Sequence, residues 1–470
     1  MVKRHPDLFD EIANFGALMQ AARRAVRGKR GKPGAAAFVA GLETEILRLE
    51  RELQARIWKP GRYIEIEVFT PKHRVVSAAP FRDRVVHHAL CAVVEPIFER
   101  GFIFDSYANR TGKGTHKAVA RYERYRDRNR HVLRCDIFRY FPAIDHQILK
   151  DDLRRRIACP RTLWLLDMVI DGSNPQEPVH LHYPGDDLLT PLTRRRGLPI
   201  GNLTSQFFAN VYLDGLDHFV KEVLRAPYLR YVDDFALFHD DPAVLAEWQT
   251  RIAARLARRR LSLHPGKTLI SSNEASATFL GFVLLPGGRR RLPEENVRRF
   301  RNRLRGLRDR YHAGMVDLDQ AMRHICSWVA HAGHADTWRL REAIFRGAVF
   351  DPSRRPDRSP AASSAAAPGT TTHGTCARPT ATTTHRTTET TISASELPRH
   401  PAAGAGVFTE TPGRARVCPG PVMMRSLLQE AVAASVSAGN GDGRRCACAQ
   451  HHPVSVRPAA QGEVNPARWS

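Results

Sequence analysis

Two adjacent carboxylates stand between two apolar stretches in the segment YVDDFALFHD. Their flanks are rich in aromatic and branched side chains, so Tyr228–Val232 and Phe235–Phe238 are predicted to form the two strands of a hairpin. Asp233 and Asp234 would then fill its turn, although Asn-Gly or Asp-Gly suits a tight turn better. Neighbouring carboxylates repel each other, and divalent cations, which take oxygen ligands, would relieve that repulsion.

A third carboxylate with the same potential is Asp136, in the segment HVLRCDIFRYFPAIDH. Apolar neighbours mark a strand over 131–137, and a charge inside such a strand costs free energy unless it is paired or bound to a metal. We therefore expect Asp136, Asp233 and Asp234 to hold two Mg²⁺ ions, with Ile137 included in the metal site. Two ions suit an in-line displacement, because one activates the nucleophile and the other stabilises the leaving group. The plainer interpretation of the Asp-Asp pair is an ordinary acidic turn.

The elements that must position these carboxylates mix strands with helices. Strands are expected at 62–69 and 131–137 and in the hairpin at 228–239. Helical patterns occupy 36–58, 83–99, 115–127, 145–157, 204–224 and 243–260, and helix is expected again from about 293 to 350. Asp145 is interpreted as the N-cap of the helix at 145–157. Because the strands and helices do not alternate regularly, the predicted fold class is α+β.

These motifs resemble those of reverse transcriptases. YVDD resembles their catalytic box, DIFRYFPAIDH their preceding aspartate motif, and FLGF (279–282) the motif that leads into their thumb. SYANRTGKGTHKAV (106–119) is similar to a block of their fingers domain, and all four motifs occur in family order over roughly residues 60–350. The resemblance implies a right-hand polymerase fold with fingers, a palm with an antiparallel sheet and an α-helical thumb. It also implies RNA-templated DNA synthesis from dNTPs with catalytic Asp136, Asp233 and Asp234.

The segment GLPIGNLTSQ (197–206) indicates a subtype. Group II intron and related enzymes usually carry a Gln-Gly…Ser-Pro pattern here, whereas Ile200, Gly201 and Gln206 resemble the reverse transcriptases of diversity-generating retroelements. Those enzymes copy a template RNA with frequent errors at adenines for mutagenic retrohoming, and a small basic oligomeric accessory protein assists them. Ile200 in place of Gln removes hydrogen-bonding capacity near the nucleotide, and Gly201 allows the backbone a close approach. The alternative is a glycine-rich loop that caps a buried helix.

Further nucleotide contacts follow from the same resemblance. Phe141 occupies the place of the steric gate that excludes a ribose 2′-hydroxyl, and Lys72 or Arg74 would meet the triphosphate. Arg110 would contact the nucleotide or template, and Lys267 would assist departure of pyrophosphate. The plain alternatives are a core aromatic residue for Phe141 and solvated surface cations for the others.

A basic helical segment, EENVRRFRNRLRGLRDR (294–310), is expected to lie along the template–primer backbone. Its candidate nucleic-acid contacts are Arg298, Arg299, Arg301 and Arg303. Such phosphate contacts give affinity that falls with salt and carry little sequence information.

Charge and composition divide the chain near residue 351. The net charge is +24, of which residues 351–470 contribute +5, so +19 belongs to the first 350 residues and favours a polyanionic partner. The Ala-, Thr-, Gly- and Pro-rich tail 351–470 is predicted to be disordered. The other predicted domains are a helical extension at 1–60, fingers and palm at 61–285, and the thumb at 286–350.

The sequence also limits where the protein is expected to act. It contains no run of 18 apolar residues that would span a membrane, and its N-terminus has no apolar core of a signal peptide. Its eight cysteines are scattered, so we expect no disulfide framework and a cytoplasmic, bacterial or phage-encoded protein. Two rivals stay open: a group II intron-like or phage-defence reverse transcriptase, and a catalytically idle RNA-binding protein.

Overall fold

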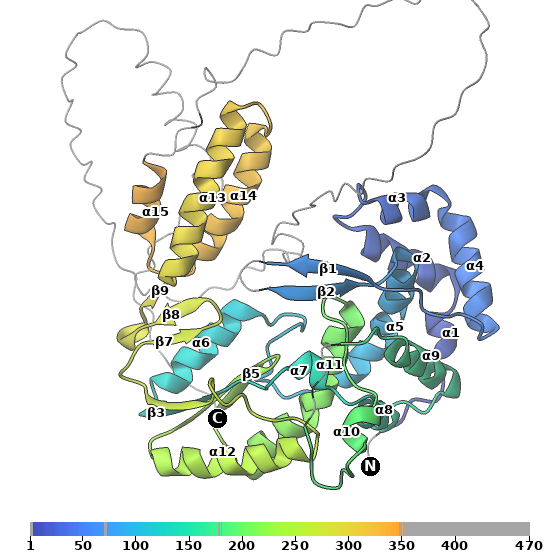
Figure 1. Ribbon diagram of the computed structural model, residues 1–470, viewed down its shortest axis with the longest axis horizontal. Coiled ribbons are helices and arrows are strands. Elements are labelled where there is room, and N and C mark those ends of the chain that lie inside the picture. The colour runs from blue at the N-terminus through green and yellow to red at the C-terminus, as the bar shows by residue number, and fades with distance from the viewer. Residues whose placement is uncertain (1–2, 70–72, 177–178, 180, 347–349, 351–470) are drawn as a thin grey trace, which may run out of the picture. The chain divides into compact units, whose positions relative to one another are not determined.

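The computed structural model describes residues 3–69, 73–176, 179, 181–346 and 350 (Figure 1). These residues form two compact units. The first comprises residues 3–300 and 328–341, and the second comprises residues 301–327 and 342–346 with Phe350. Residue Lys72 and the tail 351–470 lie outside the described residues, and the four predicted domain boundaries stay predictions.

Four helices open the first unit: α1 (Phe9–Ile12), α2 (Phe15–Val26), α3 (Pro33–Ala40) and α4 (Leu42–Gln54). Asn14 caps α2, because its side chain accepts a hydrogen bond from the backbone N–H of Ala17 at 2.9 Å. The single helix predicted over 36–58 is wrong. Gly41, with φ −116° and ψ 34°, leaves the helical range and separates α3 from α4, which agrees with the poor helix propensity of glycine.

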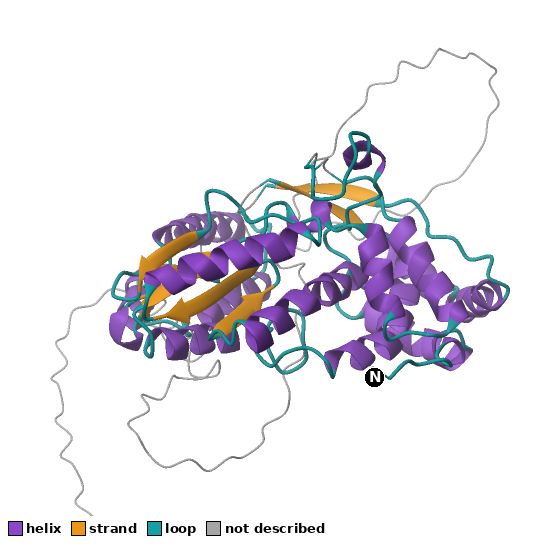
Figure 2. Ribbon diagram, turned by 90° about the horizontal axis from the view of Figure 1, so that it is seen from below, coloured by secondary structure: helices purple, strands orange, loops and turns teal. Residues whose placement is uncertain are grey.

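A four-stranded antiparallel sheet lies at the centre of the first unit, and Figure 2 shows its strands beside the helices that pack on them. Its members are β3 (His131–Cys135), β4 (Tyr228–Tyr231), β5 (Asp234–His239) and β6 (Leu269–Ser272), in the order β4-β5-β3-β6. The predicted strand and hairpin are thus confirmed, although β3 ends one residue before Asp136.

The two faces of this sheet bury different clusters of apolar side chains. Because side chains alternate along a strand, Leu133 and Leu237 share one face, which packs against α12 (Pro242–Ala257). The same apolar cluster includes residues of α11 (Leu203–His218). Val132 and Phe238 point to the other face and pack with Tyr122 of α6 (Thr115–Arg126). Apolar side chains therefore cover both faces of the sheet, and a charged residue in these strands needs a specific partner.

Smaller elements surround the central sheet. The strands β1 (Ile64–Val68) and β2 (Arg74–Ala78) form a two-stranded antiparallel ladder, and β7 (Ala277–Phe279), β8 (Phe282–Leu284) and β9 (Arg290–Arg291) form a three-stranded sheet. The remaining helices are α5 (Phe81–Glu99), α7 (Tyr140–Ala143), α8 (His146–Arg154), α9 (Pro160–Asp171) and α10 (Thr190–Thr193), with a π-helical turn at Phe219–Val223 and a 3₁₀ turn at Pro286–Gly288. Asp145 caps α8 as predicted, because it accepts from the N–H of Ile148 at 3.0 Å.

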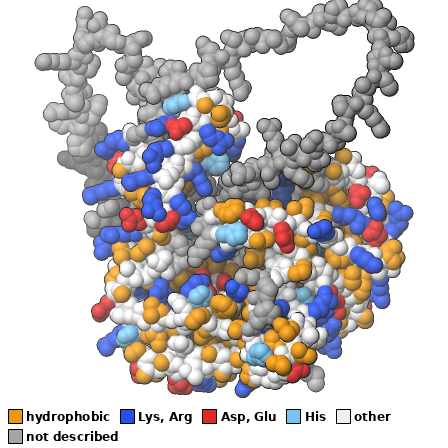
Figure 3. All heavy atoms as spheres, viewed as in Figure 1, with side chains coloured by type: hydrophobic (Ala, Val, Ile, Leu, Met, Phe, Trp, Pro, Cys, Tyr) orange, Lys and Arg blue, Asp and Glu red, His pale blue; other side chains and the backbone are white. Residues whose placement is uncertain are grey.

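Three helices complete the described chain: α13 (Glu294–His312), α14 (Leu318–Ala332) and α15 (Trp338–Phe345). Their arginine side chains, most of which lie on α13, give a strongly basic surface that is blue in Figure 3. Within the second unit, Leu304, Leu307 and Tyr311 form the buried face of α13, in the spacing of an amphipathic helix.

The α+β class predicted from the sequence is confirmed by these helices and antiparallel sheets. Four cysteines fall within the described residues, and all four are free thiols; Cys91, Cys135 and Cys159 are buried, and Cys326 is exposed. In the part of the chain that the structure describes, none of the helices is both long enough and apolar enough to cross a membrane.

Candidate active site

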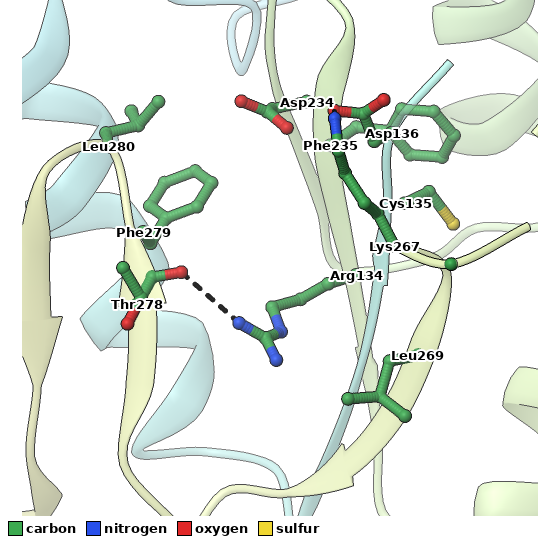
Figure 4. Close-up of a pocket in the computed structure, with 11 residues that line it drawn as sticks. Arg134, Cys135, Asp136, Asp234, Phe235, Lys267, Leu269, Thr278, Phe279 and Leu280 are labelled. Atoms are coloured by element: carbon green, nitrogen blue, oxygen red, sulfur yellow. Dashed lines mark hydrogen bonds and ion pairs between the residues drawn. The ribbon is translucent and has the colours of Figure 1, made fainter. Parts of the chain in front are cut away.

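The register of the central sheet places Asp136 and Asp234 side by side. Cys135 pairs with Phe235 in the ladder of β3 and β5, so the next two positions, Asp136 and Asp234, face each other across the strands. The two carboxyl groups lie close enough to interact, and Asp136 contributes to the raised pKa of Asp234. Figure 4 shows both carboxyl groups at the upper end of the cavity, next to the tip of Lys267.

The hairpin turn differs from the prediction that Asp233 and Asp234 fill it. Tyr231 pairs with Asp234, so the two turn residues are Val232 and Asp233, and Asp234 begins β5. Val232 has φ 58°, a conformation that is strained for a β-branched residue. The turn takes Asp233 out of the ladder and leaves Asp234 in it, so the two adjacent carboxylates have different surroundings.

Arg230 holds this turn from inside the protein. Its side chain is fully buried, and its Nη1 donates to the carbonyl oxygen of Val232 at 3.0 Å. Asp217 of α11 accepts from Arg230 Nε at 2.8 Å and from Nη2 at 2.6 Å, and Asn210 accepts from Nη1 at 3.2 Å. Arg230 was not among the site residues predicted from the sequence. The signal that exposed Asp136, a charge within an apolar strand, is also present in YLRYVDD.

Negative charge accumulates at the three aspartates. Burial is the main cause that raises the pKa of Asp234 to about 7, and the carboxylates of Asp233 and Asp136 add to the rise. Burial also raises the pKa of Asp233, while the positive charges of Lys267 and Arg74 oppose that rise. Lys267 Nζ donates to Asp136 Oδ2 at 2.8 Å. A cation at this place would restore the charged forms of both buried carboxyl groups.

These residues fit a divalent cation by the chemistry of their donor atoms. Asp136 and Asp234 offer carboxylate oxygens in contact with each other, and Asp233 adds its charge to the same site. Within the described residues, no three His, Cys, Asp or Glu side chains come together closely enough to complete a metal site by themselves. Mg²⁺ commonly takes one or two carboxylates and completes its shell with water and substrate phosphates. The pair Asp136 and Asp234 matches that requirement.

The loop that precedes α11 is anchored on β2. The N–H of Ser77 donates to the carbonyl oxygen of Ile200 at 3.1 Å, and Asn202 Nδ2 donates to the carbonyl oxygen of Ser77 at 2.7 Å. Gly201 has φ 104°, and a Cβ there would lie 2.6 Å from Val76 Cγ1. The position therefore requires glycine for its conformation and for the close approach of a strand.

Three predicted nucleotide contacts lie around this loop and the aspartates. Arg74 is exposed on β2, and its charge acts on Asp233. Phe141 is partly buried in α7, and its carbonyl oxygen accepts from the N–H of Leu198 at 2.9 Å. Gln206 is partly exposed in the first turn of α11. The structure thus joins the predicted steric gate to the loop of the subtype motif.

Arg110 is a correction to the predicted nucleotide contacts. Its side chain is buried, with Nε donating to Glu99 Oε1 at 2.7 Å and Nη1 donating to the carbonyl oxygens of Ile103 and Ser106 at 2.6 and 2.9 Å. These bonds tie the end of α5 to the following loop and leave the guanidinium unavailable to a nucleotide. The sequence showed its charge but not these tertiary partners.

A cavity of about 300 Å³ adjoins the two paired carboxylates (Figure 4). Besides Asp136, Asp234 and Lys267, its walls include Arg134 and Leu280. Arg134 Nη1 donates to the carbonyl oxygen of Thr278 at 3.2 Å, which connects β3 to the FLGF segment. Leu280 belongs to the FLGF motif identified from the sequence, whereas Arg134 was not among the predicted site residues. Leu280, with φ 47°, lies in the turn between β7 and β8.

The four predicted nucleic-acid contacts lie on α13. Arg298 pairs with Glu295 at 2.9 Å, and Arg299 lies 3.6 Å from the same carboxylate. Arg301 and Arg303 are exposed. The arginines of this helix are thus on the surface or partly exposed, where a phosphate backbone can reach them.

Comparisons with known proteins identify the segment that holds this site. The profile of the family described as "Reverse transcriptase (RNA-dependent DNA polymerase)" matches residues 57–284. Protein YkfC of Escherichia coli (strain K12) is 27% identical over 190 residues, which are 39% of this chain and 47% of that protein. The "Putative COX1/OXI3 intron 2 protein" of Saccharomyces cerevisiae is 21% identical over 176 residues, 37% of this chain and 19% of that protein.

This chain therefore spans about half the length of the first of these relatives and less of the second. Among solved structures, apo telomerase from Candida tropicalis, truncated from the C-terminal domain, aligns with a TM-score of 0.38 and 13% identity. That alignment covers 50% of this chain and 55% of the telomerase chain. The family match includes Asp136, Asp233 and Asp234 and ends at the last residue of β8.

Proposed function

We propose, from the premise that residues 57–284 form a reverse transcriptase domain, that this protein is an RNA-directed DNA polymerase. The observation that carries the proposal is the contact between the carboxyl groups of Asp136 and Asp234 at the end of an antiparallel sheet, inside the matched segment. We infer a right-hand arrangement in which residues 61–285 supply fingers and palm and residues 286–350 supply the thumb.

The proposed reaction is a nucleotidyl transfer with two Mg²⁺ ions, which would activate a primer 3′-hydroxyl and stabilise the departing pyrophosphate. Asp136 and Asp234 would hold the ions, with Asp233 completing the acidic site. Arg74 would meet the triphosphate from β2, and Phe141 would exclude a ribose 2′-hydroxyl. Lys267, which pairs with Asp136 at 2.8 Å, would assist the departure of pyrophosphate by stabilising its negative charge.

The test uses the purified full chain, a primed RNA template, dNTPs and Mg²⁺. Asp136→Ala, Asp233→Ala and Asp234→Ala should each lower primer extension by at least about a hundredfold, because metal-assisted charge stabilisation is worth several kcal/mol. Asp127→Ala is the matched control, since Asp127 is an exposed acid at the end of α6. Equal incorporation by wild type and Asp233→Ala would overturn the proposal.

RNA binding separates this enzyme from an idle RNA-binding protein. The Asp233→Ala variant should bind primed RNA at least as well as wild type, because it removes a negative charge near the phosphates. Loss of extension with retained binding supports the polymerase. Absence of extension by the wild-type protein, together with tight RNA binding, would favour the idle protein.

We further propose the diversity-generating subtype, with errors concentrated at template adenines. The support is the segment GLPIGNLTSQ. Its Ile200 lies in the loop that is anchored to β2, and the side chain of Ile200 cannot form a hydrogen bond. Sequencing of cDNA made by wild type should show more misincorporation at adenine than at the other three bases. An even spread of errors would contradict the subtype.

The subtype also implies two things outside this chain. One is a small basic oligomeric accessory protein that helps to hold the template RNA. The other is a pair of near-identical DNA repeats near the gene, which differ mainly where one of them has adenine. The competing proposal is a group II intron-like enzyme, which the name of the yeast intron protein favours. Dependence of activity on an intron RNA instead of a repeat RNA would decide for that alternative.

A further inference from the structure

A second cavity, of about 330 Å³, opens on another part of the first unit. It lies at the N-terminal turn of α8, the end of α9, and α10, with Arg260 contributed by the segment after α12. It shares no lining residue with the cavity at the aspartates. Its size is in the range of pockets that hold small ligands.

His146 lines this cavity and has an unused acceptor atom. The residue is 5% exposed, and its Nδ1 is buried and has no hydrogen-bond partner. Its Nε2 lies 2.8 Å from the carbonyl oxygen of Gly197, and since a carbonyl only accepts, Nε2 carries the proton. Burial lowers the pKa of His146, so the ring is neutral and Nδ1 keeps a lone pair. This atom calls for a donor from a ligand.

A carboxylate stands next to that acceptor. Asp171 Oδ1 is 3.9 Å from His146 Nδ1, too far for a direct hydrogen bond. Asp171 also accepts from Lys150 Nζ at 2.6 and 2.7 Å, which fixes its orientation. A hydroxyl group beside this pair of atoms, at hydrogen-bond distance from both, would donate to one of them.

Three arginines and the carboxylate Asp145 line the rest of the cavity. Arg194 is held by Asp186 at 3.0 Å, and Arg260 by Asp145 at 2.6 Å. Arg195 has a side chain that is 63% exposed, and its Nη2 donates to the carbonyl oxygen of Asp171 at 2.7 Å. The N-terminal turn of α8 adds the positive end of a helix dipole. These groups suit a phosphate, which guanidinium groups bind well.

We propose that this cavity binds a ribose–phosphate unit, with a ribose hydroxyl at His146 Nδ1 and a phosphate at Arg195 and Arg260. Two sources can supply that chemistry, a free ribonucleotide or an RNA chain. The 2′-hydroxyl is the group that distinguishes RNA from DNA, so the site would select ribose. This contact is separate from polymerisation and holds whether or not the aspartates are catalytic.

The test is calorimetric binding to the full chain in EDTA, without primer or template. One pair of probes is adenosine 3′,5′-bisphosphate and its 2′-deoxy analogue, which differ only in the 2′-hydroxyl. The second pair is a 12-nucleotide RNA and the DNA of the same sequence. Wild type should prefer the ribose member of at least one pair by about three- to tenfold, the worth of one net hydrogen bond.

The variants locate the preference. His146→Gln keeps a donor for Gly197 and removes Nδ1, so the ribose preference should fall to about one. Arg195→Gln should weaken the ribose and deoxyribose members alike. The matched control is Arg155→Gln, an arginine of the same segment that is 74% exposed, does not line the cavity and should bind as wild type does.

The outcomes are distinct. Preference with the bisphosphate pair identifies a free ribonucleotide, and preference with the oligonucleotide pair alone identifies RNA. No ribose preference in wild type, or a preference that persists in His146→Gln, would overturn the proposal. If thermal unfolding shows that His146→Gln does not fold, Arg195→Gln decides the question. Unchanged affinity in Arg195→Gln would contradict a phosphate bound at Arg195.

Discussion

Arg230 Nη1 donates a hydrogen bond to the carbonyl oxygen of Val232 at 3.0 Å. The donor is fully buried and the acceptor belongs to a residue with φ 58°, so a packed side chain secures a strained turn. That turn carries Asp233 at the edge of the acidic site. Arg230 is thus a positioning residue, while Asp136 and Asp234 are the groups in contact with the proposed metal.

Replacement of Arg230 by Met should lower both stability and polymerase activity. It leaves the buried Asp217 without its cation, which typically costs about 3–5 kcal/mol. It also removes the donor to Val232, so primer extension should fall by more than the fraction of unfolded protein explains. Urea unfolding and extension assays on the same preparation measure the two effects.

A double variant separates positioning from stability. Asp217→Asn with Arg230→Met removes the orphaned charge and leaves an acceptor for the hydroxyl of Tyr228, which donates to Asp217 at 2.7 Å in wild type. It should recover much of the lost stability but little of the activity. Recovery of both would show that Arg230 acts through stability alone.

The sequence allowed the site to be predicted only where local rules sufficed. The cost of a charge in an apolar strand pointed to Asp136, and the repulsion between two adjacent carboxylates pointed to Asp233 and Asp234. The pairing of Asp136 with Asp234 depends on the register of β3 and β5, which no local pattern states. Arg110 was misjudged because its partners Glu99, Ile103 and Ser106 become neighbours only in the folded chain.

The fold was predictable to a similar degree. The spacing of apolar residues predicted the central hairpin, β3 and most helices. Burial of one or two faces of an element repeats apolar residues at a regular interval in the sequence. The break at Gly41 was overlooked although glycine marks it. The turn at Val232 was unpredictable from propensity, because a positive φ at a β-branched residue is stabilised by the tertiary contact with Arg230.

Gly201→Ala should destabilise the protein by roughly 1–3 kcal/mol, the usual cost of a strained backbone. Its φ is 104°, and the added Cβ would meet Val76 Cγ1 at 2.6 Å. The double variant with Val76→Ala should recover only the steric part. The control is Gly215→Ala, which lies in α11 with nothing within 4 Å and should stabilise by up to about 1 kcal/mol. Equal effects at both glycines in urea unfolding would contradict this account.

Lys267→Met should lower the Mg²⁺ concentration needed for half-maximal activity. The ammonium of Lys267 pairs with Asp136 Oδ2 at 2.8 Å and competes with a metal for that carboxylate. Its side chain is 49% exposed, so the gain should be modest, up to about fivefold for an ion pair of ~1 kcal/mol. Lys267→Arg keeps the charge and should leave the midpoint near wild type. A higher Mg²⁺ midpoint in Lys267→Met would contradict competition.

His87 should make the protein less stable in acid. Its ring is buried in α5, and burial is the main cause that lowers its pKa to about 3. An unfolded histidine titrates near 6.5, so between about pH 6.5 and 3 the unfolded chain binds a proton that the native chain does not. Stability is therefore lost as the pH falls through this window.

His87→Leu removes that proton and should flatten the pH profile. Relative to pH 7, the variant should lose about 2 kcal/mol less than wild type at pH 4.5, by the linkage between pKa and unfolding free energy. Urea unfolding at the two pH values measures the difference. Parallel profiles for the two proteins would show that His87 is not the group responsible.

The arginines of α13 should set the salt dependence of template–primer binding. Each phosphate contact contributes a slope of about −0.7 to −0.9 in log K against log salt. Arg301→Gln with Arg303→Gln should therefore flatten the slope by roughly 1.5, equally for unrelated sequences. Arg298→Gln should change it less, because Glu295 already pairs with Arg298 at 2.9 Å. The control is Arg346→Gln, directly after the end of α15, because Arg346 is 76% exposed and pairs with Glu342. An unchanged slope in the double variant would mean that the nucleic acid does not follow α13.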